Sequence, residues 1–359
     1  MKANLSRSRA FEQELREEVR RQGDALDDYL SSIMGLHAFI NSTIWDVEKR
    51  ILRQESKSST QRRMTVLAED QSKEVTPDAV VQVNNTYGIV VEMKKHFDRE
   101  KLKHFDQVKK YDADLVGWWT QNERLATNDL VLMTHYISKT AATDAYNEWM
   151  SNGNSYVRPF AIICFNYSTG SKEYFTLERA IGSLSDKIHD EDLRKVKAIP
   201  NDIIKKIISK YKFYDAPPPA IHTMVLLLDY VLPTLPKEAE FDKNSGQQST
   251  RVQLTLDEAQ DQLSHLCPQP TDSRDTKLPR REWVEVGLES LVECGIGEKV
   301  AGNPPKYVLR LLTAHRRKDT KEFLVERFML KLKSDLSAGP GGGSNQGELF
   351  LLPPPTPSA

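Results

Sequence analysis

Three charged residues interrupt two short apolar runs of the chain. Asp78 stands directly before one run, and Glu92 and Lys94 stand at the end of the run that begins at Ile89. β-Branched residues favour extended structure, and alternate side chains of a strand point to opposite faces, so Glu92 and Lys94 share one face. Charges in a buried strand are costly unless they are paired, bound to a metal or placed at a cleft. We therefore predict a chemical site where these strands end.

The elements that position these charges are a hairpin and the helix after it. Asn84, Asn85 and Gly88 are turn-forming residues between the two runs, so residues 75–95 are predicted to form a β-hairpin. A helix is predicted from residue 98 to about residue 111, with Leu, Phe and Val on its apolar side.

The wider order of elements predicts an α/β fold with a mixed sheet flanked by helices. Apolar residues at helical spacing predict helix throughout residues 1–55, and a polar composition predicts a loop or a solvated edge over residues 55–74. Beyond the hairpin we predict a strand at 129–133, a helix at 141–150, a strand at 160–165 and a helix at 203–212.

A second module is predicted after the break at Pro217-Pro218-Pro219. It comprises a helix at 220–235, a capping box at Thr255-Leu-Asp-Glu258 that starts a helix to 266, a helix at 280–294 ended by Gly295, a hairpin at 296–312 and a last helix at 320–332.

Helices followed directly by a hairpin resemble the winged-helix module, with the helix at 280–294 in the recognition position. The resemblance implies that Arg280, Arg281 and Lys306 face DNA phosphates. The alternative is a dimerisation or protein-docking unit with ordinary solvated Lys and Arg side chains.

Pro77-Asp78 followed by Glu92-Met93-Lys94 resembles the PD-(D/E)XK nuclease superfamily in residue type, spacing and hairpin context. The resemblance implies a restriction-endonuclease-like core and cleavage of phosphodiester bonds with Mg²⁺ or Mn²⁺. It implies that Asp78 and Glu92 are metal ligands, that the Met93 carbonyl is a further ligand, and that Lys94 orients the attacking water and offsets charge. The bland alternative is a turn aspartate beside a surface ion pair.

Gln107-Val-Lys-Lys-Tyr111 in the next helix matches the QxxxY motif of the RecB-like branch of this superfamily. By resemblance, Gln107 braces the site or contacts substrate, and Tyr111 contacts a substrate phosphate or positions the helix. An amphipathic core role for Tyr111 is the alternative. Members of the superfamily carry a further acid on the first helix; Glu48 is the candidate here and Glu55 its competitor, with a solvated helix residue as the alternative.

Composition limits the remaining classes of protein. The formal net charge is -1 and the pI about 6.7, so attraction to phosphate requires local patches. Cys164, Cys267 and Cys294 lack zinc-ligand spacing and indicate a reducing compartment. No apolar run approaches the roughly 18 residues of a membrane span, so we predict a soluble cytoplasmic protein without a membrane partner. Trp118 and Trp119 either pack in the core or stack on bases.

The C-terminal tail offers a separate motif. Gln346, Leu349 and Phe350, after a glycine-rich linker, resemble the peptide with which bacterial polymerases and repair proteins bind the sliding clamp. A tail that merely ends in hydrophobic residues is the alternative.

Together these patterns predict four parts and one function. The parts are a helical extension at 1–55, a nuclease-like domain at 56–215, a winged-helix-like domain at 216–335 and a flexible tail at 336–359. The predicted function is metal-dependent hydrolysis of DNA in repair or in defence against foreign DNA. The alternative is a catalytically inactive nuclease fold that serves as a DNA-binding adaptor or regulator.

Overall fold

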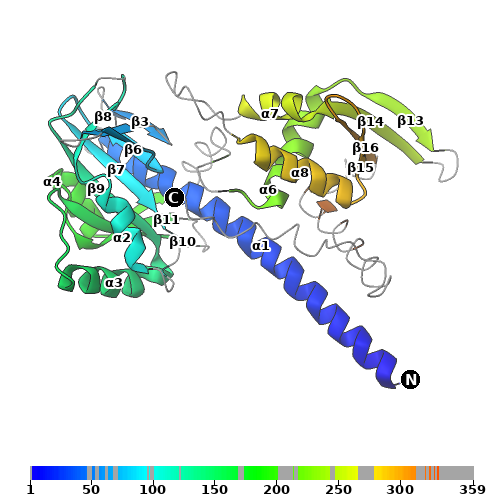
Figure 1. Ribbon diagram of the computed structural model, residues 1–359. Coiled ribbons are helices and arrows are strands. Elements are labelled where there is room, and N and C mark those ends of the chain that lie inside the picture. Colours follow the sequence, from blue (N-terminus) through cyan, green and yellow to red (C-terminus); the bar gives the residue numbers. More distant parts are fainter. Residues whose placement is uncertain are drawn as a thin grey trace. The chain divides into compact units, whose positions relative to one another are not determined.

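The computed structural model describes residues 2–46, 51–52, 56–60, 64–67, 72–94, 97, 101–120, 123–168, 174–200, 213, 217–242, 247–265 and 279–312, together with 320, 323, 324, 327 and 330. These residues fall into two compact units, drawn in Figure 1. The large-sheet unit lies within Leu30–Asp215. The small-sheet unit combines Met1–Tyr29 with the described residues from Ala216 onward.

A seven-stranded mixed sheet forms the centre of the large-sheet unit. Its strand order is β12-β11-β10-β9-β7-β6-β3, in which β7 pairs parallel to β9 and β9 parallel to β10, and the other pairs are antiparallel. The strands are β3 (Lys57–Thr60), β6 (Ala79–Gln82), β7 (Tyr87–Met93), β9 (Thr127–His135), β10 (Phe160–Ser168), β11 (Tyr174–Gly182) and β12 (Lys197–Pro200). The predicted mixed α/β architecture is confirmed at this level.

Helices cover both faces of this sheet, which is why its central strands are apolar along their whole length. Val81, Ile89 and Val91 face a core shared with the end of α1 (Lys2–Ile44) and with α4 (Lys187–Arg194). Val80 and Val90 point to the other face, where α2 (Lys101–Lys109) and α3 (Lys139–Ser151) pack (Figure 1). Residue parity along β7 thus decides which core a side chain enters.

The predicted hairpin is present as β6 and β7, but its turn is shorter than predicted. The Asn84 side chain accepts hydrogen bonds from the backbone N–H groups of Thr86 at 2.8 Å and Tyr87 at 2.9 Å, which closes the reversal. Gly88 lies inside β7, so its predicted place in the turn is wrong. A Cβ atom at Gly88 would lie 2.3 Å from the Trp118 ring, and the glycine therefore makes room for this buried tryptophan.

Two further predictions for the large-sheet unit need correction. The loop predicted at 55–74 is wrong in part, because β3 is the outermost strand of the seven-stranded sheet, as the alternative of a solvated edge allows, and β4 (Met64–Leu67) pairs with both β5 (Ser72–Val75) and β8 (Asp114–Val116) and buries Met64. The predicted N-terminal helix does not reach residue 55, because α1 ends at Ile44 and is followed by the short antiparallel pair β1 (Trp45–Asp46) and β2 (Ile51–Leu52). Aromatic and β-branched residues suit a strand as well as a helical stripe.

The small-sheet unit follows the predicted order of helices and hairpin. Its elements are α6 (Ala220–Leu226), the π-helix η2 (Leu227–Val231), the 3₁₀-helix η3 (Leu232–Thr234), β13 (Glu238–Asp242), β14 (Gln247–Thr255), α7 (Leu256–Ser264), α8 (Arg281–Glu293), β15 (Gly297–Val300) and β16 (Lys306–Leu312). The strand order is β13-β14-β16-β15. β13 and β14 were not predicted.

Both predicted helix ends in this unit are confirmed. Thr255 and Glu258 form a capping box at the start of α7. Gly295 has φ of 68° after α8, and its N–H bonds to the Val292 carbonyl at 2.9 Å. The described positions of the last predicted helix are helical. The predicted helix at 203–212 and the tail lie outside the described residues. No described helix is long and apolar enough to cross a membrane.

Candidate active site

Glu92 is the buried centre of the candidate site. It lies next to the last residue of β7, on the face that α2 covers, and only 2% of its side chain is exposed. A carboxylate in this position requires hydrogen-bond partners or a counter-charge. The structure supplies both.

Gln107, Tyr111 and Lys94 all contact the Glu92 carboxylate. The Gln107 Nε2 group donates to Oε1, and the Tyr111 hydroxyl donates to Oε2 at 2.9 Å. The Lys94 Nζ atom lies 2.9 Å from Oε1. Residues that the sequence motifs named separately therefore meet at one carboxylate, with charge-assisted bonds on both of its oxygens.

Tyr111 lies in the turn that follows α2. The helix stops at Lys109, two residues earlier than predicted, and the Tyr111 N–H then bonds to the Val108 carbonyl at 3.0 Å in a tight turn. The Tyr111 side chain is 3% exposed. Burial, followed by the charges of Glu92 and Asp78, raises the pKa of Tyr111, so its hydroxyl stays protonated and acts as a donor.

Asp78 and Met93 complete the end of the hairpin. Every second residue pair along an antiparallel ladder is joined by hydrogen bonds. The Val83 N–H bonds to the Tyr87 carbonyl, and the register continues in steps of two residues, so Pro77 and Met93 would form the last hydrogen-bonded pair. Pro77 has no N–H to give to the Met93 carbonyl. The Met93 N–H, which the ladder would pair with the Pro77 carbonyl, donates to the Asp78 Oδ2 atom at 2.6 Å. The proline thus ends the ladder beside Asp78.

These groups have the chemistry of a site for a hard divalent cation. Carboxylate and carbonyl oxygens are the ligands that Mg²⁺ and Mn²⁺ prefer, and Asp78, Glu92 and the Met93 carbonyl provide them. Both carboxylates lie close enough to Tyr111 to raise its pKa. Within the described residues, no group of three or more His, Cys, Asp and Glu side chains is arranged to hold a metal. Glu48 and Glu55, the candidates for a further acid, lie outside the described residues.

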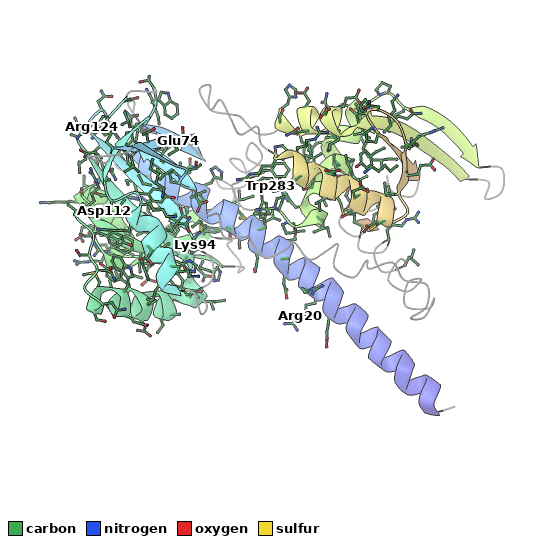
Figure 2. The ribbon with its side chains drawn as sticks, in the orientation of Figure 1. Arg20, Glu74, Lys94, Asp112, Arg124 and Trp283 are labelled. Atoms are coloured by element: carbon green, nitrogen blue, oxygen red, sulfur yellow. The ribbon has the colours of Figure 1, made fainter. Side chains whose placement is uncertain are left out.

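Lys94 forms the solvent side of the site. Its side chain is 24% exposed, and its backbone N–H bonds to the Met133 carbonyl at the end of β9 at 2.8 Å. Figure 2 labels Lys94 among the side chains of the large-sheet unit. A partly exposed ammonium group beside a buried carboxylate can meet an anionic ligand that approaches from solvent.

A second buried carboxylate was not predicted as such. Asp129 in β9 is fully buried and accepts from the Tyr87 hydroxyl at 2.6 Å, from the Ser185 N–H at 2.6 Å and from the Ser185 hydroxyl at 2.7 Å. Burial outweighs these bonds and raises the pKa of Asp129. Tyr87 begins the strand that Met93 ends, so Asp129 lies at the edge of the sheet opposite Lys94 and ties the loop before α4 to the strands.

Two of the predicted phosphate-contacting residues of the small-sheet unit, Arg280 and Arg281, lie at the start of α8, which with α7 carries many acids. Arg281 forms an ion pair with Asp257, and the Arg280 guanidinium lies 5.3 Å from the centre of the Trp283 ring, which Figure 2 labels. Lys306 is exposed at the start of β16. α7 carries the acids Asp257, Glu258 and Asp261, and α8 carries Glu282, Glu285, Glu289 and Glu293. This charge opposes phosphate binding by α8.

The tail residues Gln346, Leu349 and Phe350 lie outside the described residues. Of the three cysteines, Cys164 and Cys294 are buried free thiols, and Cys267 lies outside the described residues.

Comparison with protein-family models, with curated proteins and with solved structures finds no match to this chain.

Proposed function

We propose that the large-sheet unit is a metal-dependent nuclease that hydrolyses phosphodiester bonds of DNA. The observation that carries the proposal is the buried Glu92 carboxylate, which Gln107, Tyr111 and Lys94 contact at the end of a strand paired with the Asp78 strand. The arrangement supports assignment to the PD-(D/E)XK superfamily, with Mg²⁺ or Mn²⁺ as cofactor.

The proposed cation would be held by Asp78, Glu92 and the Met93 carbonyl. When bound, a divalent cation neutralises phosphate charge and acidifies water. Gln107 and Tyr111 are positioning residues, since their bonds to Glu92 fix its rotamer. Lys94 is the proposed catalytic cation, which orients the attacking water and offsets the charge that develops on the phosphate oxygens.

Cleavage assays test this proposal directly. The full chain is incubated with supercoiled plasmid and with linear DNA, in Mg²⁺ or Mn²⁺ and in a chelator. Metal-dependent cutting is expected for the wild type, and loss of cutting for Asp78→Ala and Lys94→Ala. Lys187→Ala is the control, because Lys187 is exposed on α4, which packs on the other face of the sheet. Cutting by the two site variants at the wild-type rate would remove the assignment.

The second candidate is an inactive nuclease fold that acts as a DNA-bound adaptor. It is favoured by the complete set of protein partners around Glu92, which satisfies the carboxylate without a cation. It predicts DNA binding that survives Asp78→Ala, and no heat of Mn²⁺ binding in calorimetry. Mn²⁺ binding that Asp78→Ala abolishes would exclude the adaptor.

The small-sheet unit is proposed to be a winged-helix-like module. The order α6, β14, α7, α8, β15, β16 and the pairing β14-β16-β15 support this proposal. The acids of α7 and α8 favour protein docking over DNA contact for this unit.

The proposed clamp contact through Gln346, Leu349 and Phe350 is tested by pull-down with a purified bacterial sliding clamp. Phe350→Ala should abolish capture of the clamp, and equal capture by the wild type and this variant would refute the proposed contact.

A further inference from the structure

Two neighbouring large apolar side chains are exposed at the end of β9. Tyr136 is 47% exposed and Ile137 is 81% exposed. They belong to η1, the 3₁₀ turn Tyr136–Ser138. Among the described residues, this is the only place where two consecutive large apolar side chains are both exposed. An exposed apolar surface is a place where a ligand or a partner can bind.

The turn lies at the same edge of the sheet as Lys94. β7 and β9 are parallel, with Met93 opposite Met133, and the Lys94 N–H bonds to the Met133 carbonyl. Tyr136 follows three residues after Met133, past the end of the strand. η1 therefore stands beside the solvent side of the candidate site.

Hydrogen bonds hold this turn in one shape. The His135 side chain accepts from the Ile137 N–H at 3.3 Å, and the Lys139 N–H bonds to the Tyr136 carbonyl. Ser138 is buried and anchors the turn to the body of the unit. The exposed rings and methyl groups are thus presented by a fixed backbone, which lowers the entropy lost on binding.

The Tyr136 ring makes a cation–π contact with Lys139. The Lys139 Nζ atom lies 5.4 Å from the ring centre, and Lys139 also pairs with Glu178, whose hydrogen bond raises the pKa of the lysine. Because 47% of Tyr136 is still exposed beside this lysine, part of its surface remains open to a stacking ligand.

We infer that Tyr136 and Ile137 bind an unpaired nucleobase, which stacks on the tyrosine ring next to the scissile phosphate. The inference rests on the proposed nuclease function and adds a substrate class to it, namely single-stranded DNA or a frayed end. Base stacking on aromatic rings is sequence-tolerant, because every base has a π-face, and the bases inside an intact duplex are not available for it. In this proposal the phosphate of that base lies on the side of Lys94, because η1 and Lys94 follow the paired ends of β9 and β7.

Affinity measurements on the full chain test the inference. The probes are a fluorescein-labelled oligothymidylate and a labelled blunt duplex, followed by anisotropy with Ca²⁺ in place of Mg²⁺. Tyr136→Ala should weaken binding of the single strand about 10-fold, or about 1.4 kcal/mol, and leave the duplex unchanged. Tyr136→Phe keeps the ring and should bind within about 2-fold of wild type. Val157→Ala is the matched control, because Val157 is 88% exposed and precedes β10 at the opposite edge of the sheet.

Each other outcome overturns the inference. Wild-type affinity of Tyr136→Ala for the single strand would remove base stacking, while the nuclease assignment would stand if the wild type still cuts DNA. An equal loss for single strand and duplex would also overturn it, because the ring would then act on the backbone or on the local fold. A wild type that neither binds nor cuts DNA would overturn the inference together with the proposed function.

Discussion

Removal of the Tyr111 hydroxyl isolates the contribution of one hydrogen bond to the buried Glu92 carboxylate. In Tyr111→Phe the ring keeps its packing against Phe105, Val108 and their neighbours, and only the 2.9 Å bond to Glu92 Oε2 is lost. Glu92 keeps its bonds to Gln107 and Lys94 on the other oxygen. One oxygen of a buried carboxylate is then left without its donor.

The size of the effect follows from the charge on the acceptor. A hydrogen bond to a charged group contributes about 1.5–3 kcal/mol, whereas a bond between neutral groups contributes about 0.5–1.5 kcal/mol. Tyr156→Phe is the matched control, because the Tyr156 hydroxyl donates at the same 2.9 Å to the neutral Phe105 carbonyl in the same unit. We expect Tyr111→Phe to lower the free energy of unfolding by about 2 kcal/mol and Tyr156→Phe by about 1 kcal/mol.

Urea denaturation of both variants beside the wild type measures this difference. Because both tyrosines lie in the large-sheet unit, the transition of that unit reports both losses, and an unchanged m-value keeps the comparison valid. An equal or smaller loss of stability for Tyr111→Phe than for Tyr156→Phe would show that the Tyr111 hydroxyl is not bonded to a charged Glu92. The proposed role of Tyr111 in positioning Glu92 would then be refuted.

Three further substitutions test the fold around the site. Gly88→Ala places a methyl group 2.3 Å from the Trp118 ring and should cost about 1–3 kcal/mol or more in denaturation; a neutral result would contradict the buried position of this ring. Burial raises the pKa of Asp129 in the folded state. The protonated carboxyl group therefore contributes its full share to the free energy of unfolding below the unfolded-state pKa of 3.8, and this contribution is lost as pH rises through the pKa of the folded state. Wild type should therefore lose stability relative to Asp129→Asn as pH rises from 3.5 in a series of denaturation curves, and a constant difference would refute the shift. Thr255→Ala removes the capping box of α7 and should cost about 1 kcal/mol, measured on the transition of the small-sheet unit, whereas an unchanged midpoint would show that the cap is not used.

Elements with strong local patterns were predictable from the sequence. Apolar runs predicted β9 and β10, and helical spacing predicted α3. These predictions hold because the apolar side chains that form each pattern are buried in the fold. The ends of α7 and α8 were also predictable, since a capping box and a glycine with positive φ are local signals.

Features that depend on distant partners could not be predicted. Gly88 resembles a turn residue until Trp118, thirty positions later, is known to pack over it. β4 lies in a polar stretch of sequence, and it is a strand because it pairs with β5 on one side and with the distant β8 on the other. The motifs named the residues around Glu92, but only the folded structure shows that these residues meet at its carboxylate. Asp129 could have been noticed, since it also places a charge in an apolar run.

Alternate side chains of β7 enter different cores, and Glu92 lies among those that face α2. The strand is therefore intolerant of a change in length by one residue. Val90 and Glu92 face α2, while Ile89, Val91 and Met93 face the core that includes α1. An insertion or deletion of one residue within β7 would exchange the two sets, sending Glu92 into the wrong core and its apolar neighbours toward Tyr111. Insertions or deletions of a single codon should therefore be absent from β7 in any library selected for a folded product, and the surviving ones should fall in connections outside the ladder.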